Sequence, residues 1–168
     1  MKKVIIGSLM AISVLLGCKK KEKEPVEFFS FTANGVDYFY PQIKGTAFVG
    51  DWKTLAARLL PGDMGYMITG RSKEEPSAPG QIVFLFPGDG MPIEDTIILN
   101  GLNGLVKIED FLFMGNSFST NTDYNGRIIF HQKDKSFLKG EFEFKAQNQY
   151  NNSIIHITNG QFSIIPSH

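Results

Sequence analysis

The residue with the most distinctive chemistry is Cys18, the only cysteine of the 168-residue chain. It follows a basic start, Met1–Lys3, and an almost unbroken apolar run, Val4–Gly17. A positive end, a short hydrophobic stretch and a small final residue are typical of a secretory signal peptide. A permanent membrane-spanning helix needs roughly 20 apolar residues, and this run is shorter. We therefore predict a signal peptide over residues 1–17, cleaved before Cys18.

The segment Leu15-Leu16-Gly17-Cys18 resembles the lipobox of bacterial lipoproteins, in which a Leu and a small residue precede the lipidated Cys. The resemblance implies that Cys18 is the first mature residue and carries lipid on its thiol and its freed amine. Acyl chains contribute roughly 0.8 kcal/mol per buried methylene, so several of them make an effectively permanent anchor. With its only thiol modified, the chain forms no intramolecular disulfide.

Residues 18–25 are predicted to be a lipidated polar tether, because Lys19–Glu24 contains no apolar side chain. In enterobacterial lipoproteins an Asp after the Cys retains the protein at the inner membrane. Lys19 stands at that position here, which indicates a cell-envelope protein of the outer membrane. The acid-rich signal that surface lipoproteins of Bacteroidota-type bacteria often carry is poorly matched, so the periplasmic and surface faces both stay open.

The domain behind the tether is mildly acidic. Six of the 17 basic residues and two of the 17 acidic ones precede residue 25. Residues 25–168 therefore hold 11 basic and 15 acidic side chains, a net charge of −4. Nucleic-acid binding needs clustered Lys and Arg against the phosphates. The composition therefore excludes a nucleic-acid partner and leaves the membrane, reached through lipid on Cys18, as the predicted attachment.

One segment of the domain matches the first half of a calcium-binding loop. Asn121-Thr122-Asp123-Tyr124-Asn125-Gly126 has oxygen-bearing side chains at alternate positions and Gly sixth. Position one is Asn rather than Asp, and position twelve is Gln132, which cannot give a bidentate carboxylate. We interpret the segment as a polar turn that leads into a strand at Arg127, and we predict neither a metal site nor a cofactor.

The histidines and paired acids lack a catalytic spacing. His131 and His156 fall in predicted strands, where alternation can place both on the solvent-exposed face, and no zinc-type His spacing occurs. Adjacent carboxylates on a strand point to opposite faces, so a neighbouring pair is not ready for acid–base catalysis. The pairs are Glu74-Glu75, Glu94-Asp95 and Glu109-Asp110. We assign no catalytic residue and expect a non-enzymatic protein, with an unrecognised envelope enzyme as an alternative.

Four aromatic residues could form a platform for a sugar or a peptide, because aromatic faces offer a large contact area. They are Trp52, Tyr38, Tyr40 and Tyr66. The chain also has 15 Phe residues, far more than a binding site needs. We therefore favour core packing for these four side chains.

The elements that position these residues are predicted to be strands, because short apolar runs are separated by Gly, Pro, Asn and Asp from Val26 onward. Asn34-Gly35 predicts a tight hairpin between residues 28–32 and 36–40. A second hairpin joins residues 127–132 and 137–144 through Lys133–Ser136. Gln81–Phe86 is apolar on both faces and predicts a strand in the middle of the sheet packing.

The segment after Asp51 breaks this pattern. Asp51 could cap a short helix that ends at Pro61-Gly62 and has one apolar side, formed by Trp52, Leu55, Leu59 and Leu60. The competing strand would turn Leu55, Ala57 and Leu59 inward, but Lys53 with them. We favour the helix.

The last strand changes parity. Ile155 and Ile157 share one face with Phe162 and Ile164 only if an extra residue is inserted between them. Asn159-Gly160 lies between the two pairs, so we predict a β-bulge with the Gly in a left-handed conformation.

Together these patterns predict a single all-β domain over residues 26–166. It would be an antiparallel β-sandwich or barrel of about nine or ten strands with at most one short helix.

The chain resembles a family of small uncharacterised lipoproteins of Bacteroidota. The shared signals are Asn34-Gly35, Gly126-Arg127-Ile128, Asp134, Gly140-Glu141-Phe142-Glu143-Phe144 and Ile155-His156-Ile157-Thr158-Asn159-Gly160-Gln161-Phe162. The resemblance covers about 40 residues near the carboxyl end and about a dozen near the start of the domain. It implies a β-sandwich or barrel in the cell envelope and carries over no catalytic residue.

These observations predict a lipid-anchored envelope protein that is a non-enzymatic binding or structural module for a protein or a glycan. The alternative is a lipocalin-like carrier that holds a small apolar ligand inside a closed barrel. A filled core with a flat aromatic patch outside would favour the module. An enclosed apolar cavity would favour the carrier, and a cleft with converging acids or histidines would favour an enzyme.

Overall fold

A computed structural model describes residues 26–42, 44–47, 50–61, 65–71, 80–109, 117–134 and 136–166. Within these ranges the chain forms thirteen strands and no α-helix. Every pairing between them is antiparallel. The all-β antiparallel prediction is therefore confirmed, and this part of the chain contains no helix long and apolar enough to cross a membrane.

The strands are β1 (Phe28–Ala33), β2 (Val36–Pro41), β3 (Lys44–Ala47), β4 (Gly50–Lys53), β5 (Leu55–Leu59), β6 (Tyr66–Arg71), β7 (Gln81–Phe86), β8 (Thr96–Ile98), β9 (Leu105–Glu109), β10 (Ser117–Ser119), β11 (Gly126–Lys133), β12 (Leu138–Asn148) and β13 (Ile154–Ile164). Strands β3 and β4 pair only with each other, and the other eleven share one sheet.

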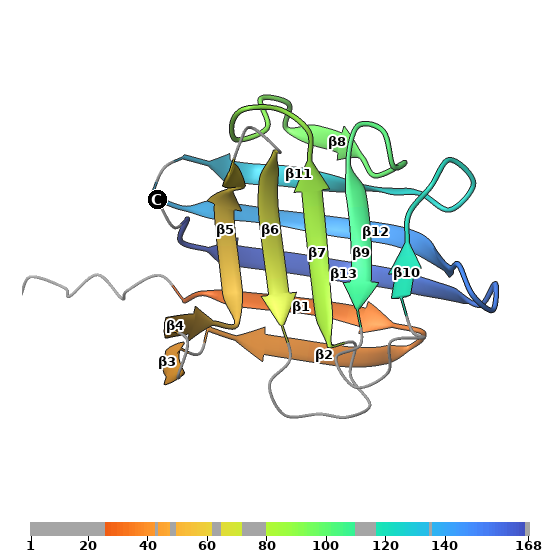
Figure 1. Ribbon diagram of the computed structural model, residues 1–168, viewed down its shortest axis with the longest axis horizontal. Coiled ribbons are helices and arrows are strands. Elements are labelled where there is room, and N and C mark those ends of the chain that lie inside the picture. Colours follow the sequence, from red (N-terminus) through yellow and green to blue (C-terminus); the bar gives the residue numbers. More distant parts are fainter. Residues whose placement is uncertain are drawn as a thin grey trace, which may run out of the picture.

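Nine strands follow one another through the main sheet in the order β2-β1-β13-β12-β10-β9-β7-β6-β5. Strand β11 pairs with β12, and β8 pairs with β11. Figure 1 shows β5, β6, β7 and β9 crossing over β1, β13, β12 and β11, so the sheet bends round into a nearly closed barrel. We call the first group the front layer, and we call β2, β1, β13, β12 and β11 the back layer.

Apolar side chains from both layers fill the space between them. Phe84 of the front layer is fully buried. Its ring centroid lies 6.1 Å from that of Phe29, 5.0 Å from that of Phe142 and 6.0 Å from that of Phe144. Each such aromatic pair adds roughly 0.5–1.5 kcal/mol beyond the burial of its area. The many Phe residues of the sequence thus hold the two layers together.

The predicted hairpins are present. Asn34 and Gly35 join β1 to β2 with φ angles of 49° and 84°, the positive values that a tight two-residue hairpin turn requires. Strands β11 and β12 pair from Gly126 opposite Phe144 to Lys133 opposite Leu138.

The predicted β-bulge in β13 is also present. Phe142 pairs with Gly160, whereas Phe144 pairs with Ile157, so two residues of β13 lie opposite one residue of β12. The left-handed residue is Asn159, with φ of 52°, and Gly160 is absent from the residues of positive φ. The left-handed assignment to the Gly is therefore wrong. Asn tolerates this conformation because its short polar side chain bonds locally.

The helix predicted after Asp51 is wrong, because residues 50–53 and 55–59 form β4 and β5. Leu55 and Ala57 are fully buried and alternate along β5, as the competing strand requires, whereas Leu59 is exposed. Leu55 pairs with Gly70 of β6. The edge of β6 thus supplies backbone partners that override the weak local preference for a helix. The side chains of Trp52 and Lys53 lie outside the described residues.

The side chain of Gln42 joins the two ends of the nine-strand order, β2 and β5. Its Oε1 accepts a hydrogen bond from the Leu55 backbone N–H at 3.1 Å, and its Nε2 donates to the Leu55 carbonyl at 3.2 Å. The Gln42 amide therefore pairs with β5 as a neighbouring strand would. Nε2 also donates to Glu27 Oε1 at 3.2 Å, and Thr54 Oγ1 donates to the Pro41 carbonyl at 2.7 Å.

Replacing Gln42 with Ala is expected to lower the free energy of unfolding by about 2 kcal/mol. The change would leave both backbone groups of the fully buried Leu55 without these partners. Urea denaturation monitored by circular dichroism measures the loss. Gln149→Ala is the control, because Gln149 is an exposed residue whose side-chain amide donates to Ser119 on the surface. Equal stability of the two variants would contradict the role assigned to Gln42.

Candidate functional site

The first candidate site is a groove on the outer surface of the back layer, which we call the outer groove. Its larger part has a volume of about 450 Å³, and its smaller part a volume of about 230 Å³. Glu141 and Gln161 line both parts, so the two are continuous. The larger part is also lined by Val26, Phe28, His131, Phe137, Lys139, Gly140, Phe162 and Ser163, and the smaller part by Arg127, Ile129, Phe142, Glu143, Asn159 and Gly160.

Strand alternation brings the polar side chains of the groove together. From Leu138 to Ala146 the residues of β12 alternate between buried and exposed, so Lys139, Glu141 and Glu143 all point outward. The register places Glu141 between Ile129 of β11 and Gln161 of β13. Three neighbouring strands therefore present a carboxylate, an amide and an apolar side chain in one row.

The charges of the groove are largely compensated. Arg127 lies 3.0 Å from Glu143, and His131 Nε2 lies 3.5 Å from Glu141 Oε2. All four side chains are about half exposed, and exposed ion pairs of this kind contribute only about 0–1 kcal/mol. The pairs add little to folding, so a ligand can displace their contacts at small cost.

An aromatic pair on β1 and β2 adjoins the groove. The rings of Phe28 and Phe39 stack with centroids 6.0 Å apart, and Phe39 is 61% exposed. The four aromatic residues of the predicted platform lie elsewhere. Tyr40 and Tyr66 are buried in the core and Tyr38 packs partly against it, which confirms core packing for these three. Phe28 and Phe39 were not among the aromatic residues singled out from the sequence. The alternation of inward and outward side chains along β1 and β2 was the signal that could have identified them.

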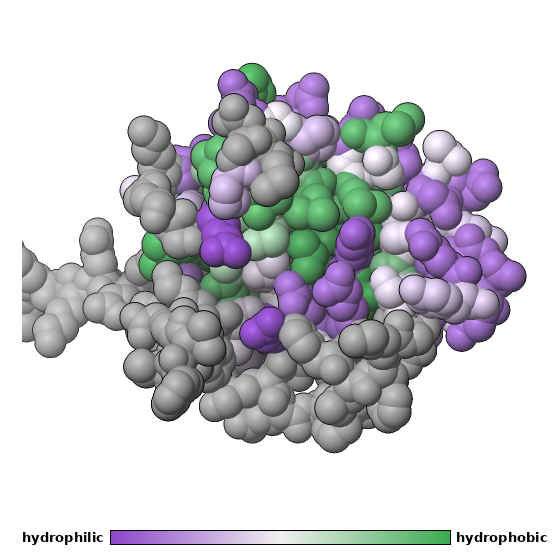
Figure 2. Space-filling view, in the orientation of Figure 1, coloured by the Kyte–Doolittle hydropathy of each residue, from purple (hydrophilic) through white to green (hydrophobic). Residues whose placement is uncertain are grey.

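The second candidate site is on the outer surface of the front layer. Met67, Leu85 and Leu105 are cross-strand neighbours in one row, and they point away from the core to which Ile68, Phe84 and Val106 belong. Figure 2 shows hydrophobic residues gathered at the centre of this surface, over β6, β7 and β9, with hydrophilic residues around them. We call Met67, Leu85 and Leu105, each of which is partly exposed, the apolar face; Val83 beside them is buried.

An antiparallel sheet with one face in water normally shows polar residues there. The apolar face breaks this rule across three adjacent strands, with the basic residues Arg58, Arg71 and Lys107 on the same surface. Contiguous apolar surface with a polar rim marks an interaction site in soluble proteins. Gln81–Phe86 forms β7 between β6 and β9, as predicted, but its outward side is not fully buried, because Leu85 is partly exposed.

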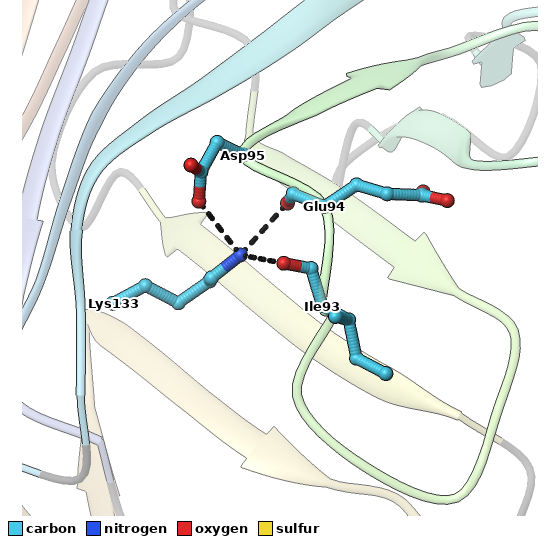
Figure 3. Close-up of polar contacts among 4 residues, drawn as sticks. All are labelled: Ile93, Glu94, Asp95 and Lys133. Atoms are coloured by element: carbon cyan, nitrogen blue, oxygen red, sulfur yellow. Dashed lines mark hydrogen bonds and ion pairs between the residues drawn. The ribbon is translucent and has the colours of Figure 1, made fainter.

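A separate polar cluster, around Lys133, holds a loop in place rather than a ligand. The Lys133 ammonium donates to the carbonyl oxygens of Ile93 and Glu94 and lies 3.0 Å from Asp95 Oδ1, as Figure 3 shows. These three oxygens use all three N–H donors of the ammonium group. Lys133 therefore fastens the loop before β8 to the end of β11 and has no donor left for a ligand.

The calcium-like segment is a polar turn, as predicted. Asn121 Oδ1 accepts hydrogen bonds from the backbone N–H groups of Asp123 and Tyr124, and β11 begins at Gly126. His131 and His156 are both exposed on strands, as alternation indicated. In the described ranges, no group of three or more His, Cys, Asp or Glu side chains is placed to hold a metal ion. Glu74, Glu75, Asp110 and His168 lie outside those ranges.

Tyr66 carries the one unusual polar group described in the interior. Its side chain is buried at the start of β6, and its hydroxyl has no hydrogen-bond partner among the described residues. Burial disfavours the phenolate and raises the pKa of Tyr66 from 10.0 to about 12. The unfolded chain therefore loses this proton at a lower pH than the folded domain does.

Tyr66→Phe is expected to raise the free energy of unfolding by about 1 kcal/mol at neutral pH, because an unpaired buried hydroxyl is removed. In the wild type the raised pKa gives stability that is complete below pH 10 and is lost as the pH rises to about 12. Tyr66→Phe has no hydroxyl to ionise at this position, so this loss of stability should be absent from the variant. Urea titrations between neutral pH and the alkaline range measure the difference. Tyr150→Phe, on the exposed β12–β13 turn, is the control and should follow the wild type.

Cys18, the predicted lipid-attachment residue, lies outside the described residues, so the geometry neither supports nor opposes its modification. Within those residues the groove, the aromatic pair and the apolar face all lie on the outside of a core filled with apolar side chains. No protein-family model matches the chain, and neither a curated protein nor a solved structure matches it.

Proposed function

We propose that this protein is a lipid-anchored, non-enzymatic binding module of the bacterial cell envelope, held at the outer membrane by lipid on Cys18. The sequence around Cys18 and the polar tether support the anchor. The domain behind it docks an envelope protein. Membership of the Bacteroidota lipoprotein family remains a prediction from the resemblance of the strand and turn motifs.

The single observation that carries the docking function is the apolar face. Met67, Leu85 and Leu105 lie side by side on three strands, where water would otherwise contact them. Burial of apolar area contributes about 25 cal/mol per Å², so a complementary apolar surface would be held there. The charged rim, in which Arg58 and Lys107 stand with Glu109, would fix the orientation of the partner.

The test starts with the full-length protein purified in detergent from its own envelope. A partner that copurifies is identified by mass and recombined with purified wild-type protein. Leu85→Asp is expected to weaken that binding at least about tenfold, because a carboxylate at the centre of the interface loses its water. Ile154→Asp, on a half-exposed residue of the back layer, is the control and should bind normally. Equal binding by wild type and Leu85→Asp would refute the docking role.

A carrier of a small apolar ligand is the second candidate, and the unpartnered hydroxyl of Tyr66 favours it. A ligand that accepts a hydrogen bond would satisfy that group inside the barrel. Titration with an apolar fluorescent probe such as 1-aminoanthracene separates the two functions. Saturable binding of one probe per protein that weakens in Tyr66→Phe supports the carrier. The docking module predicts no such binding.

A further inference from the structure

We propose that the outer groove is a binding site for a neutral saccharide. This site goes beyond the docking of a protein, because it lies on the back layer and shares no residue with the apolar face. Its larger part, at about 450 Å³, falls within the usual range for ligand sites.

The aromatic pair supplies the apolar half of saccharide recognition. The C–H faces of a sugar ring pack well against the flat face of an aromatic ring, which offers a large rigid area. Phe28 lines the groove, and Phe39 stacks on it with 61% of its surface exposed. A sugar unit that leaves the groove toward β2 would therefore meet an aromatic surface.

The floor of the groove supplies the hydrogen-bonding half. Sugar hydroxyl groups both donate and accept, so they need donors and acceptors in close alternation. Glu141 offers a carboxylate acceptor, Gln161 offers an amide with both functions, and His131 offers an imidazole beside Glu141. Glu141 and Gln161 are direct cross-strand neighbours, so one ring can contact both side chains.

The charge balance favours an uncharged ligand. Each acidic side chain of the groove has a cationic or imidazole neighbour, Arg127 for Glu143 and His131 for Glu141. Lys139 lies over the Phe137 ring, with its Nζ 4.9 Å from the ring centroid. An acidic ligand would face two carboxylates, and binding of an anionic polymer needs a cluster of unpaired cations. A neutral saccharide meets neither obstacle.

The same strands disfavour an extended peptide. Strand β13 pairs with β1 and β12, and β12 pairs with β13 and β11, so the backbone groups under the groove are already hydrogen-bonded. A peptide that binds by strand addition needs an open sheet edge. The groove offers side chains alone, and those side chains suit hydroxyl groups.

The test is calorimetric titration of the full-length protein in detergent with three neutral hexasaccharides: cellohexaose, maltohexaose and hexa-N-acetylchitohexaose. At least one is expected to bind with a Kd below about 1 mM. Phe39→Ala and Glu141→Gln are each expected to weaken that binding at least about tenfold. Tyr150→Ala and Glu94→Gln are the matched controls, an exposed aromatic residue and an exposed acid away from the groove, and both should bind as the wild type does.

Three results would overturn the proposal: no binding of any neutral hexasaccharide at about 5 mM, binding that Phe39→Ala and Glu141→Gln both leave unchanged, or stronger binding of the acidic polymer polygalacturonate. Leu85→Asp should retain saccharide binding in full. A failure of the groove is therefore distinguishable from a failure of the apolar face, because each variant affects one surface only.

Discussion

Gly160→Ala is expected to lower the free energy of unfolding by about 3 kcal/mol, because the added methyl group would overpack the core at this point. A Cβ at residue 160 would lie closer than 3.0 Å to two ring carbons and the carbonyl oxygen of Phe142. The ring cannot move aside, because its centroid is 4.9 Å from that of Phe29 and 5.0 Å from that of Phe84. The clash would therefore distort the β-bulge and the packing between the two layers.

Urea denaturation of the variant measures this loss, with Gly90→Ala as the matched control. A Cβ at Gly90 meets nothing within 4 Å, and its φ is not positive, so the control should change stability by less than about 0.5 kcal/mol. The contact between Gly160 and Phe142 would lose its assigned role if both Ala variants unfolded at the same urea concentration.

Local patterns predicted the parts of the fold in which sequence neighbours form the structure. Asn34-Gly35 specified a tight turn, and the segment Lys133–Ser136 specified the hairpin that pairs β11 with β12. The parity change across Asn159-Gly160 specified a bulge. Each of these depends on side-chain direction within one strand or one hairpin, which the sequence states directly.

Tertiary partners decided the parts that were predicted wrongly. Residues 51–60 match both a helix and a strand, and the edge of β6 settles the choice for β5. Asn159 has the left-handed conformation, and Gly160 does not. A Gly is required at position 160 because the Phe142 ring lies too close for a Cβ. Both facts concern segments that are distant in the sequence.

The candidate sites were still less accessible to sequence analysis. The outer groove exists because the register aligns Ile129, Glu141 and Gln161 on three strands. The apolar run Gln81–Phe86 was expected to be buried on both faces, as strands in the middle of a packed sheet are. One of those faces is instead on the outside of the front layer, and only the spatial order of the strands reveals it.

Replacing Cys18 with Ala is expected to block lipidation and maturation of the protein. We expect attachment to depend on the proposed lipid on Cys18, because the apolar run before it is too short to span a bilayer and the tether after it is polar. The variant protein should remain unprocessed or appear in the soluble periplasmic fraction. Labelling with a radioactive fatty acid and the mass of the mature amino-terminal peptide measure both steps, and Ser13→Ala within the apolar run is the control.

The stability of the folded domain should not change in the same variant, since residue 18 precedes the first described strand by ten positions. Processed Cys18→Ala protein is therefore expected to unfold at the same urea concentration as the wild type. It is also expected to bind the neutral hexasaccharides with the same affinity, which separates anchoring from recognition. The lipid anchor must be abandoned if wild-type protein takes up no labelled fatty acid and its mature chain starts at a residue other than Cys18.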